Sequence, residues 1–357
     1  MAFAGDVASS MIALTILPQV AARWQLSPLT LATLAATSFA GQVVGAPVWG
    51  TLADAWGRKP TFMASQAIVA VFGILTALSP TPRWLVACRA LVGLGVGGSE
   101  IAMGLLVEFA PPPRGSYLIR VHYVAALGAI YVGGCAWLLD DDNWRLVAAL
   151  AAVPSSLVAA SAACSLEESP RWLASRGRHD EAAAVLAKIW MRHPDAAAPP
   201  WISMPTTTAT SRCAFFCSSR SLLIWLFWGA FGVAYYGIVG LVGVIYKHDL
   251  LFLTVAPTSE LLFTYLGARV VDKSRRATAA ALATCGALAL LAMELVTGPR
   301  ANTLARGALA YAARGALFGA GGVAWILTPE LAPTDVEVAA ARGPRQRSSA
   351  RGGAPRR

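Results

Sequence analysis

Apolar positions along the chain form long stretches that are separated by short polar connectors. Each stretch has about 20 residues, which as a helix is enough to cross roughly 30 Å of hydrocarbon. An α-helix satisfies its own backbone hydrogen bonds in lipid, so we expect an all-α, polytopic helical membrane protein. The ten expected spans are 2–22, 29–53, 61–79, 84–110, 116–139, 145–165, 220–246, 250–270, 277–297 and 303–328.

The polar stretch between the sixth and seventh spans is the domain boundary that this pattern indicates. It holds a short amphipathic segment near 180–192 and then a linker rich in Pro, Thr and Ser. We therefore expect a six-helix bundle over 1–166, a loop with an amphipathic helix over 167–219 and a four-helix bundle over 220–336. The final segment, 337–357, is rich in Arg, Gly, Ser and Ala and is predicted to be a basic, disordered tail.

Composition supports a bilayer as the solvent. The chain of 357 residues is 56% hydrophobic and 13% charged, whereas a soluble domain has about 25% charged residues. The net charge of +10 could suggest a nucleic-acid partner. However, the basic residues lie in connectors between apolar spans, which is typical of a membrane protein with positive cytoplasmic loops. We expect lipid, and no nucleic acid, as the partner of this surface.

The distribution of basic residues predicts the orientation. The connectors after the second, fourth, sixth and eighth spans carry most of the Lys and Arg residues, while the opposite side includes Asp140, Asp141 and Asp142. Positive connectors stay in the cytoplasm. The N-terminus and the central loop are therefore expected to be cytoplasmic, in either the plasma membrane or an organellar membrane.

Signs of catalysis are missing from the sequence. The four His residues are dispersed, and no nucleophile elbow or phosphate-binding Walker loop occurs. We expect no enzyme activity, no catalytic residue, no metal and no cofactor. The energy for any movement of solutes across the membrane would then come from a solute or proton gradient and not from ATP.

The two groups of spans repeat the same polar markers at equivalent helix ends. A carboxylate followed by a basic pair comes after the second and eighth spans, and Glu-x-x-Pro comes after the fourth and tenth. These residues are Asp54, Arg58 and Lys59 in the first group with Asp272, Arg275 and Arg276 in the second, and Glu108 and Pro111 with Glu330 and Pro333. Internal repeats of this kind are typical of secondary transporters.

Four motifs in this order resemble those of the major facilitator superfamily, in particular its sugar-porter and organic-ion or synaptic-vesicle-protein-like branches. The loop pattern G-x-x-x-D-x-x-G-R-K and the fourth-helix pattern R-x-x-x-G-x-G-x-G-G are both matched in full. The sequences E-x-x-P-x-x-R-G and E-E-S-P-R-W-L complete the set, the latter with Glu167 in place of a Pro. The matching residues are Gly50, Asp54, Gly57, Arg58 and Lys59; Arg89, Gly93, Gly95, Gly97 and Gly98; Glu108, Pro111, Arg114 and Gly115; and Glu168, Ser169, Pro170, Arg171, Trp172 and Leu173.

The resemblance implies two helical bundles around a central cavity and secondary transport of a small organic solute by alternating access. The solute class, sugar or organic ion, stays open, as does coupling to protons. That family has twelve helices, and ten are expected here. The alternative is therefore a truncated, non-transporting membrane protein that acts as a receptor or binding partner. A monomer is expected.

Ionisable and aromatic residues inside the spans are the candidates for the transport site, because a charge at the bilayer centre is costly. By resemblance, Asp6 would carry a proton and Arg89 would pair with it, although Asp6 lies close enough to the start of its span to be interfacial. Glu100 is expected either to recognise a cation or a proton, or to make a structural hydrogen bond. The remaining cavity candidates are Glu260, Tyr235 and Tyr236, with helix packing as the alternative role for the two tyrosines.

Charges at the cytoplasmic ends of the spans form a second set of candidates. In the resembling family such residues pair into a latch that holds the two halves together while the cavity is open to the outside. Solvated ion pairs contribute only about 0–1 kcal/mol each, so several members are needed, and solvated anchors without a gating role are the alternative. The expected latch residues are Gly50, Asp54, Gly57, Arg58, Lys59, Glu108, Arg114, Glu168, Arg171, Asp272, Arg275 and Glu330.

Overall fold

The computed structural model describes residues 2–109, 114–139, 143–192, 219–245, 255–296 and 303–331, and the regular structure within these ranges is α-helical. The first eight helices are α1 (Ala2–Trp24), α2 (Pro28–Trp56), α3 (Arg58–Ala77), α4 (Pro82–Val96), α5 (Glu100–Phe109), α6 (Arg114–Ile119), α7 (Val121–Leu138) and α8 (Trp144–Ser165). They are followed by α9 (Pro170–Ser175), α10 (His179–Arg192), α12 (Ser219–Ile245), α14 (Thr258–Val270), α15 (Arg275–Leu295) and α16 (Thr303–Leu331).

The predicted all-α, polytopic membrane fold is confirmed. Within the described residues, eight helical segments are long and apolar enough to cross a membrane. The helix that matches the predicted span 250–270 is α14, which has 13 residues, and residues 250–254 lie outside the described part of the chain. The helix α10 occupies the position of the predicted amphipathic segment, and the predicted tail 337–357 is likewise outside the description.

The predicted span 84–110 differs from the structure because it is interrupted. A turn at Gly97–Ser99 separates α4 from α5, and it is closed by short-range backbone bonds from Gly98 N to Gly95 O (2.9 Å) and from Ser99 N to Val96 O (3.0 Å). Glycine has a low helix propensity, and this turn packs directly against neighbouring helices. A Cβ on Gly97 would lie 2.7 Å from the backbone nitrogen of Ala46.

Several helices begin at residues that cap them. Ser27, Thr81 and Ser274 each accept a hydrogen bond from the backbone N–H three residues later, at 3.2, 3.3 and 3.4 Å respectively. Proline follows directly at the first helical position of α2 and α4. Both features satisfy or remove backbone donors that a helix start would otherwise leave unpaired.

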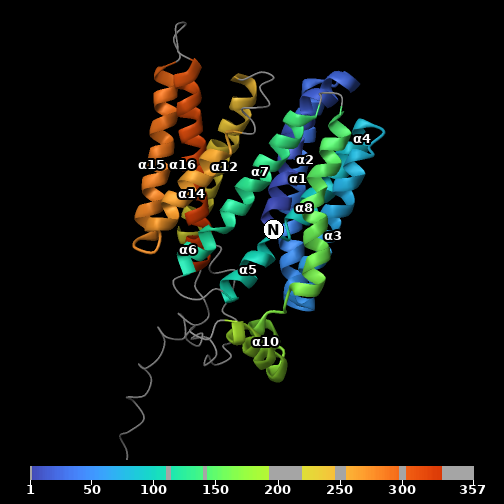
Figure 1. Cartoon of the computed structure of the whole chain (residues 1–357), viewed down its shortest axis with the longest axis vertical. Helices are drawn as coiled ribbons and strands as arrows, with labels where there is room; N and C mark the ends of the chain where they lie inside the picture. Colours follow the sequence, from blue (N-terminus) through green and yellow to red (C-terminus); the bar gives the residue numbers. More distant parts are fainter. Residues whose placement is uncertain are drawn as a thin grey trace, which may run out of the picture.

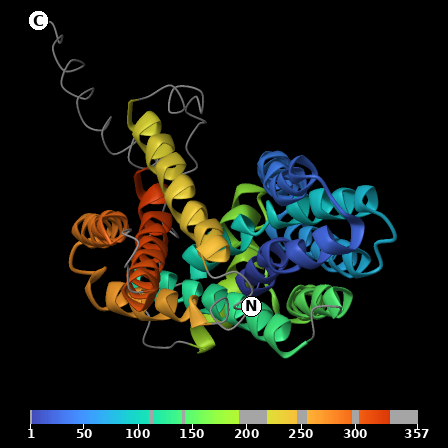
Figure 2. The ribbon, with the colours of Figure 1, turned by 90° about the horizontal axis from the view of Figure 1, so that it is seen from above.

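The long helices form two groups that stand side by side (Figures 1 and 2). The first group contains α1, α2, α3, α4 and α8, and the second contains α12, α14, α15 and α16. The helix α7 packs on α1 in the first group and also on α14 in the second. The short helices α9 and α10 lie beyond one end of the bundle (Figure 1), and we call this end the α10 face. The division into domains at 166 and 219 stays a prediction.

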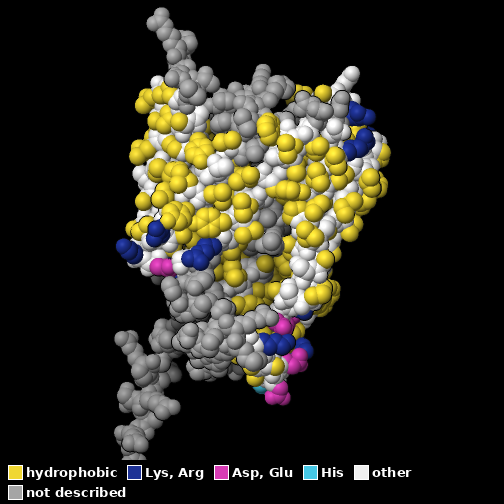
Figure 3. Space-filling view, viewed as in Figure 1, with side chains coloured by type: hydrophobic (Ala, Val, Ile, Leu, Met, Phe, Trp, Pro, Cys, Tyr) yellow, Lys and Arg dark blue, Asp and Glu magenta, His cyan; other side chains and the backbone are white. Residues whose placement is uncertain are grey.

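The surface has an apolar middle and charged ends. On the side shown in Figure 3, Lys, Arg, Asp and Glu side chains gather toward the α10 face and Lys or Arg side chains lie at the opposite end, with hydrophobic side chains between them. Large exposed apolar residues on these helices include Leu223, Val233 and Leu295. A water-soluble protein would not expose such a belt, whereas lipid solvates it without cost.

Glycine contacts bring α2 and α4 together at backbone distance. A Cβ on Gly41 would overlap the carbonyl oxygen of Ala90, and a Cβ on Gly93 would overlap that of Ser38. The indole Nε1 of Trp49 on α2 donates a hydrogen bond of 2.7 Å to the carbonyl of Leu94 on α4. Small residues at matching positions permit this approach, which is the usual way of packing helices in lipid. The fourth-helix glycines thus have a packing role.

Candidate functional site

A buried polar network lies inside the second group of helices. The Nε of Arg314 on α16 donates to Oε1 of Glu260 on α14 at 2.8 Å, and the hydroxyl of Tyr235 on α12 donates to the same oxygen at 2.7 Å. The exposed fractions of Glu260, Arg314 and Tyr235 are 1%, 2% and 6%. Three helices therefore converge on one carboxylate oxygen that water hardly reaches. Paired, hydrogen-bonded charges are the form in which charges persist in a membrane interior.

Aromatic rings surround this network and extend it to the first group of helices. The ring of Tyr235 stacks on Phe231 at 5.6 Å and lies 5.7 Å from Phe318. The ring of the next residue, Tyr236, contacts that of Tyr235 edge-on at 5.2 Å and also meets Phe39 of α2 edge-on, with ring centroids 4.9 Å apart. Tyr236 is 43% exposed. Tyr235, a member of the polar network, is thus the sequence neighbour of a residue that contacts the first group of helices.

Sequence reasoning selected Glu260, Tyr235 and Tyr236, but it missed Arg314. The signal was available, because Arg314 is an ionisable residue inside the predicted span 303–328. The rule that selected Glu260 also applies to this arginine. The structure joins the three residues Tyr235, Glu260 and Arg314, and Arg314 is therefore added to the candidates.

The predicted pair of Asp6 and Arg89 is described only in part. Arg89 is 2% exposed, its Nε lies 3.2 Å from the Ser38 hydroxyl of α2, and its Nη2 donates to the carbonyl of Ser9 on α1. Asp6 belongs to α1, but its side chain lies outside the described part of the structure. Glu100 is the first residue of α5 and its side chain is exposed. The proposed roles of Asp6 and Glu100 stay predictions.

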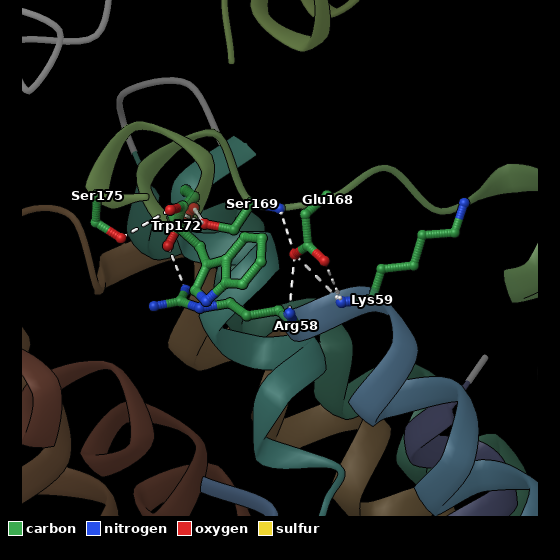
Figure 4. A network of polar contacts seen from close by, with 7 residues as sticks. Arg58, Lys59, Glu168, Ser169, Trp172 and Ser175 are labelled. Atoms are coloured by element: carbon green, nitrogen blue, oxygen red, sulfur yellow. Dashed lines mark hydrogen bonds and ion pairs between the residues drawn. The ribbon is translucent and has the colours of Figure 1, made fainter. Parts of the chain in front are cut away.

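A second polar network lies at the α10 face and ties the first group of helices to α9 (Figure 4). Glu168, just before α9, accepts backbone hydrogen bonds at the start of α3 from Arg58 N (2.9 Å) and Lys59 N (3.2 Å). The Lys59 side chain extends away from Glu168 (Figure 4). A carboxylate is favourable at a helix N-terminus because it meets unpaired N–H groups and the positive end of the helix dipole. Glu168 therefore acts as a cap of α3.

Glu108 at the end of α5 completes this network. Its Oε1 pairs with the guanidinium of Arg58, and its Oε2 accepts a hydrogen bond of 2.5 Å from the Ser169 hydroxyl. Gly57 precedes Arg58 with φ of 109°, a left-handed conformation that favours glycine. A Cβ at Gly57 would also lie 2.5 Å from Oε2 of Glu168. The motif spacing thus brings the ends of three helices to one place.

Asp54 contributes its backbone carbonyl to the network at the α10 face. Its carbonyl accepts hydrogen bonds from Trp172 Nε1 at 3.0 Å and from Arg176 Nη2 at 2.7 Å. Both donors belong to the α9 region, so this contact docks α9 onto the end of α2. Asp54 is exposed and takes part in a further interaction.

At the α10 face, an apolar cluster joins the part of the chain before residue 166 to the part after residue 219, which we call the first and second halves of the chain. Met103, Leu118 and Ile119 of the first half form one buried cluster with Val271, Val323 and Ile326 of the second half. We call these six residues the α10-face cluster. Beside it, the imidazole of His122 meets Phe318 and Trp325 edge-on at 5.6 and 6.3 Å. Apolar burial contributes about 25 cal/mol per Å², whereas a solvated ion pair contributes little.

One predicted latch residue, Asp272, links the two halves of the chain. Asp272, after α14, accepts a hydrogen bond of 3.2 Å from the backbone N–H of Ser116 in the first turn of α6. A Cβ on Gly115 would overlap the Asp272 carboxylate. Asp272 thus meets the N-terminal end of α6 much as Glu168 meets that of α3, although the former contact crosses between the halves.

Three further predicted latch residues are described by their positions, and one of them, Arg275, takes part in an interaction of its own. Arg171 is exposed in α9, Arg275 begins α15, and Gly50 has open space around the position of a Cβ. The side chains of Arg114 and Glu330 lie outside the described part of the chain. Within the described residues, the predicted latch residues contribute to the network around Glu168 and Glu108 and to the separate Asp272 contact, and the latch itself stays a prediction.

Removing the Glu168 carboxylate should loosen the start of α3. For Glu168→Ala we expect amide hydrogen exchange at Arg58 and Lys59 to rise roughly fivefold, because loss of an N-terminal cap costs about 1 kcal/mol. Glu168→Gln should restore part of the protection, since an amide oxygen still accepts a hydrogen bond. The control is Glu181→Ala, which breaks an exposed pair with Arg178. Equal exchange in Glu168→Ala and the control would contradict the capping role.

Comparisons with known proteins place the chain in one family. The sequence profile described as "Sugar (and other) transporter" matches residues 8–342. Organic cation/carnitine transporter 7 of Arabidopsis thaliana is 35% identical over 191 residues, which is 53% of this chain and 38% of that protein. Synaptic vesicle 2-related protein of Pongo abelii is 26% identical over an alignment that covers 94% of this chain and 66% of that protein. The chain thus spans 38% and 66% of the lengths of these two relatives.

Solved structures share the fold. The proton:xylose symporter XylE of E. coli, bound to 6-bromo-6-deoxy-D-glucose, matches with a TM-score of 0.69 at 19% identity. The match covers 91% of this chain and 80% of XylE. At this identity the similarity concerns the arrangement of helices, and the side chains of the site have to be argued from this chain alone.

Proposed function

The chain belongs to the family of sugar (and other) transporters, and from this premise we propose that it carries a small organic solute across a membrane by alternating access. The observation that carries the proposal is the Tyr235–Glu260–Arg314 network, which is buried where α12, α14 and α16 meet, beside the contact between the two groups. In secondary transporters, solute sites lie near the midplane where the two repeats meet. Family membership supports a transporter and not an enzyme.

Aromatic and charged residues have different roles in the proposed solute site. Tyr236 and Phe39 offer aromatic faces at the meeting of the helix groups, while Glu260 and Arg314 offer charge behind them. A sugar would use hydroxyl hydrogen bonds and ring packing, and an organic ion would use a charge and an aromatic face. Both solute classes are retained. One relative is named for organic cations and carnitine, and XylE is named for xylose.

Coupling to protons is proposed through Asp6 and Arg89. Arg89 is fully buried between α1, α2 and α4 and bonds to oxygen atoms of Ser9 and Ser38. A carboxylate on α1 that approaches this arginine in one state and leaves it in another would bind a proton only in the second state. XylE is named as a proton symporter, which makes a proton gradient the first to test.

The uptake of solutes into proteoliposomes tests the proposed function. Purified protein would be given labelled xylose, glucose, carnitine or tetraethylammonium, with and without an inward proton gradient. We expect at least one solute to accumulate above the level in protein-free liposomes and Glu260→Gln to lose most of that uptake. Arg178→Gln is the control, because Arg178 is in an exposed pair far from the network. The absence of protein-dependent uptake for all four solutes would contradict the proposal.

The α10 face is proposed to be the cytoplasmic gate, closed in this conformation by the α10-face cluster and the Asp272 contact. This assignment follows the positive connectors and puts the N-terminus and the central loop in the cytoplasm. A monomer is sufficient for the mechanism, because both helix groups are in one chain.

Loss of the Asp272 carboxylate should favour opening of this gate. For Asp272→Asn we expect a shift in the population of the open state of up to about fivefold, since a solvated contact contributes about 0–1 kcal/mol. The reporter is a cysteine at Leu118, which is 3% exposed within the α10-face cluster. A water-soluble thiol reagent should label it faster in Asp272→Asn than in wild type. Asp180→Asn is the exposed control, and equal labelling rates in all three proteins would contradict the gating role.

A further inference from the structure

The guanidinium of Arg314 has a buried donor with no acceptor. Arg314 is 2% exposed, its Nε donates to Glu260, and its Nη2 has no hydrogen-bond partner within the part of the chain that the structure describes. Leaving a buried charged donor unpaired costs more than a typical hydrogen bond gains. A site that keeps such a donor unpaired is matched to a ligand that supplies the acceptor.

We propose that Nη2 of Arg314 binds a carboxylate of the transported solute, so that the solute class is carboxylate-bearing molecules. This inference rests on the proposed function and narrows it. A guanidinium presents its N–H groups in a planar fork that fits the two oxygens of a carboxylate. A sugar hydroxyl could accept one hydrogen bond there but would bring no charge to pair with the arginine.

The position of Glu260 explains why the arginine remains available. One oxygen of Glu260, Oε1, receives both the Arg314 Nε and the Tyr235 hydroxyl, at 2.8 and 2.7 Å. The pair is thereby neutral and held in one geometry, with Nε as the guanidinium donor to Glu260 and Nη2 outside this contact. Glu260 positions Arg314, and Arg314 meets the ligand.

The aromatic neighbours show from which side a solute would arrive. Tyr235 is buried against the network, whereas the adjacent Tyr236 is 43% exposed and touches Phe39 of the other helix group. A carboxylate on Arg314 would place the body of the solute along these rings. If the solute also carries an ammonium group, the rings can bind it through a cation–π contact, and the net charge of the site stays unchanged. A simple acid and a zwitterion are thus two sources of the same carboxylate.

Ligand-induced thermal stabilisation of the purified full chain in detergent tests the inference. The probes are benzoate with its uncharged amide benzamide, and phenylalanine with phenylalaninamide. We expect at least one acid to raise the unfolding midpoint and its amide to have no such effect; which acid does so identifies a simple acid or a zwitterion.

Arg314→Gln combined with Glu260→Gln avoids an unpaired carboxylate and should weaken acid binding roughly 10- to 100-fold, the value of a charged hydrogen bond. Arg314→Lys should retain part of the binding, and Arg178→Gln should retain all of it.

Three outcomes would overturn the inference: amides that stabilise as well as acids, an unchanged affinity in the double variant, or stabilisation by xylose or glucose without any by the acids. In each of these cases protein-dependent uptake of another solute would leave the proposed transport function standing. If neither stabilisation nor uptake is found with any solute, the proposed function fails together with the inference.

Discussion

Arg314→Ala is expected to lower the thermal stability of the protein strongly, through the second group of helices. The substitution leaves Glu260 buried at 1% exposure with only the Tyr235 hydroxyl as its hydrogen-bond partner in the described structure. Breaking a buried ion pair from one side costs about 3–5 kcal/mol. For a chain of this size the midpoint of thermal unfolding should fall by on the order of 10 °C.

The double substitution Arg314→Ala with Glu260→Gln separates charge from packing. It removes both charges together, so the penalty of an unpaired buried carboxylate is absent. We expect the double variant to unfold at a higher temperature than Arg314→Ala alone. The measurement is the unfolding midpoint in one detergent for wild type, both single variants and the double variant. If the double variant is less stable than Arg314→Ala, the two residues do not act as a charge pair.

Gly41→Ala is expected to have the second-largest effect, through the contact between α2 and α4. A methyl group at this position would overlap the backbone carbonyl of Ala90 and lie 2.8 Å from the nitrogen of Leu94, and neither atom can move without its helix. Overpacking of this kind costs about 1–3 kcal/mol and at times more. We expect a lower unfolding midpoint and a lower yield of monodisperse protein.

Gly50→Ala is the matched control, because it makes the same change nine residues along the same helix. A Cβ at Gly50 has no neighbour within 4 Å, and alanine has a better helix propensity than glycine. Its midpoint in detergent should equal or exceed that of wild type. Equal losses in Gly41→Ala and Gly50→Ala would mean that helix propensity or insertion, and not the approach of α2 to α4, determines the effect.

The span pattern allowed most of the fold to be predicted, because the bilayer restricts both the type and the length of the elements. Helix ends such as Pro28 and Pro82 also follow from local signals, a capping residue and a proline. The break at Gly97–Ser99 was not predicted, since an apolar run with glycines reads as one continuous helix. The turn packs closely on the backbone of α2 at Ala46, a tertiary contact that spacing along the chain does not reveal.

The sequence allowed the residues of the candidate site to be chosen, but it did not allow their contacts with one another to be predicted. Glu260 and Tyr235 could be chosen as polar residues inside apolar spans, and the same rule would have found Arg314. Which side chains meet depends on the rotation of each helix about its own axis. For this reason the network at the α10 face joins Arg58 to Glu108 within the first half, while the halves meet through an apolar cluster and Asp272.

Distances across the two ends of the helix groups test the central claim, that two bundles alternate around a shared site. Spin labels would be placed at exposed positions, Ala55 with Lys273 at the α10 face and Leu29 with Leu295 at the opposite end. The protein would be reconstituted and measured with and without a solute that it accumulates. We predict that one distance lengthens while the other shortens. Two distances that stay constant, or that change in the same direction, would contradict alternating access.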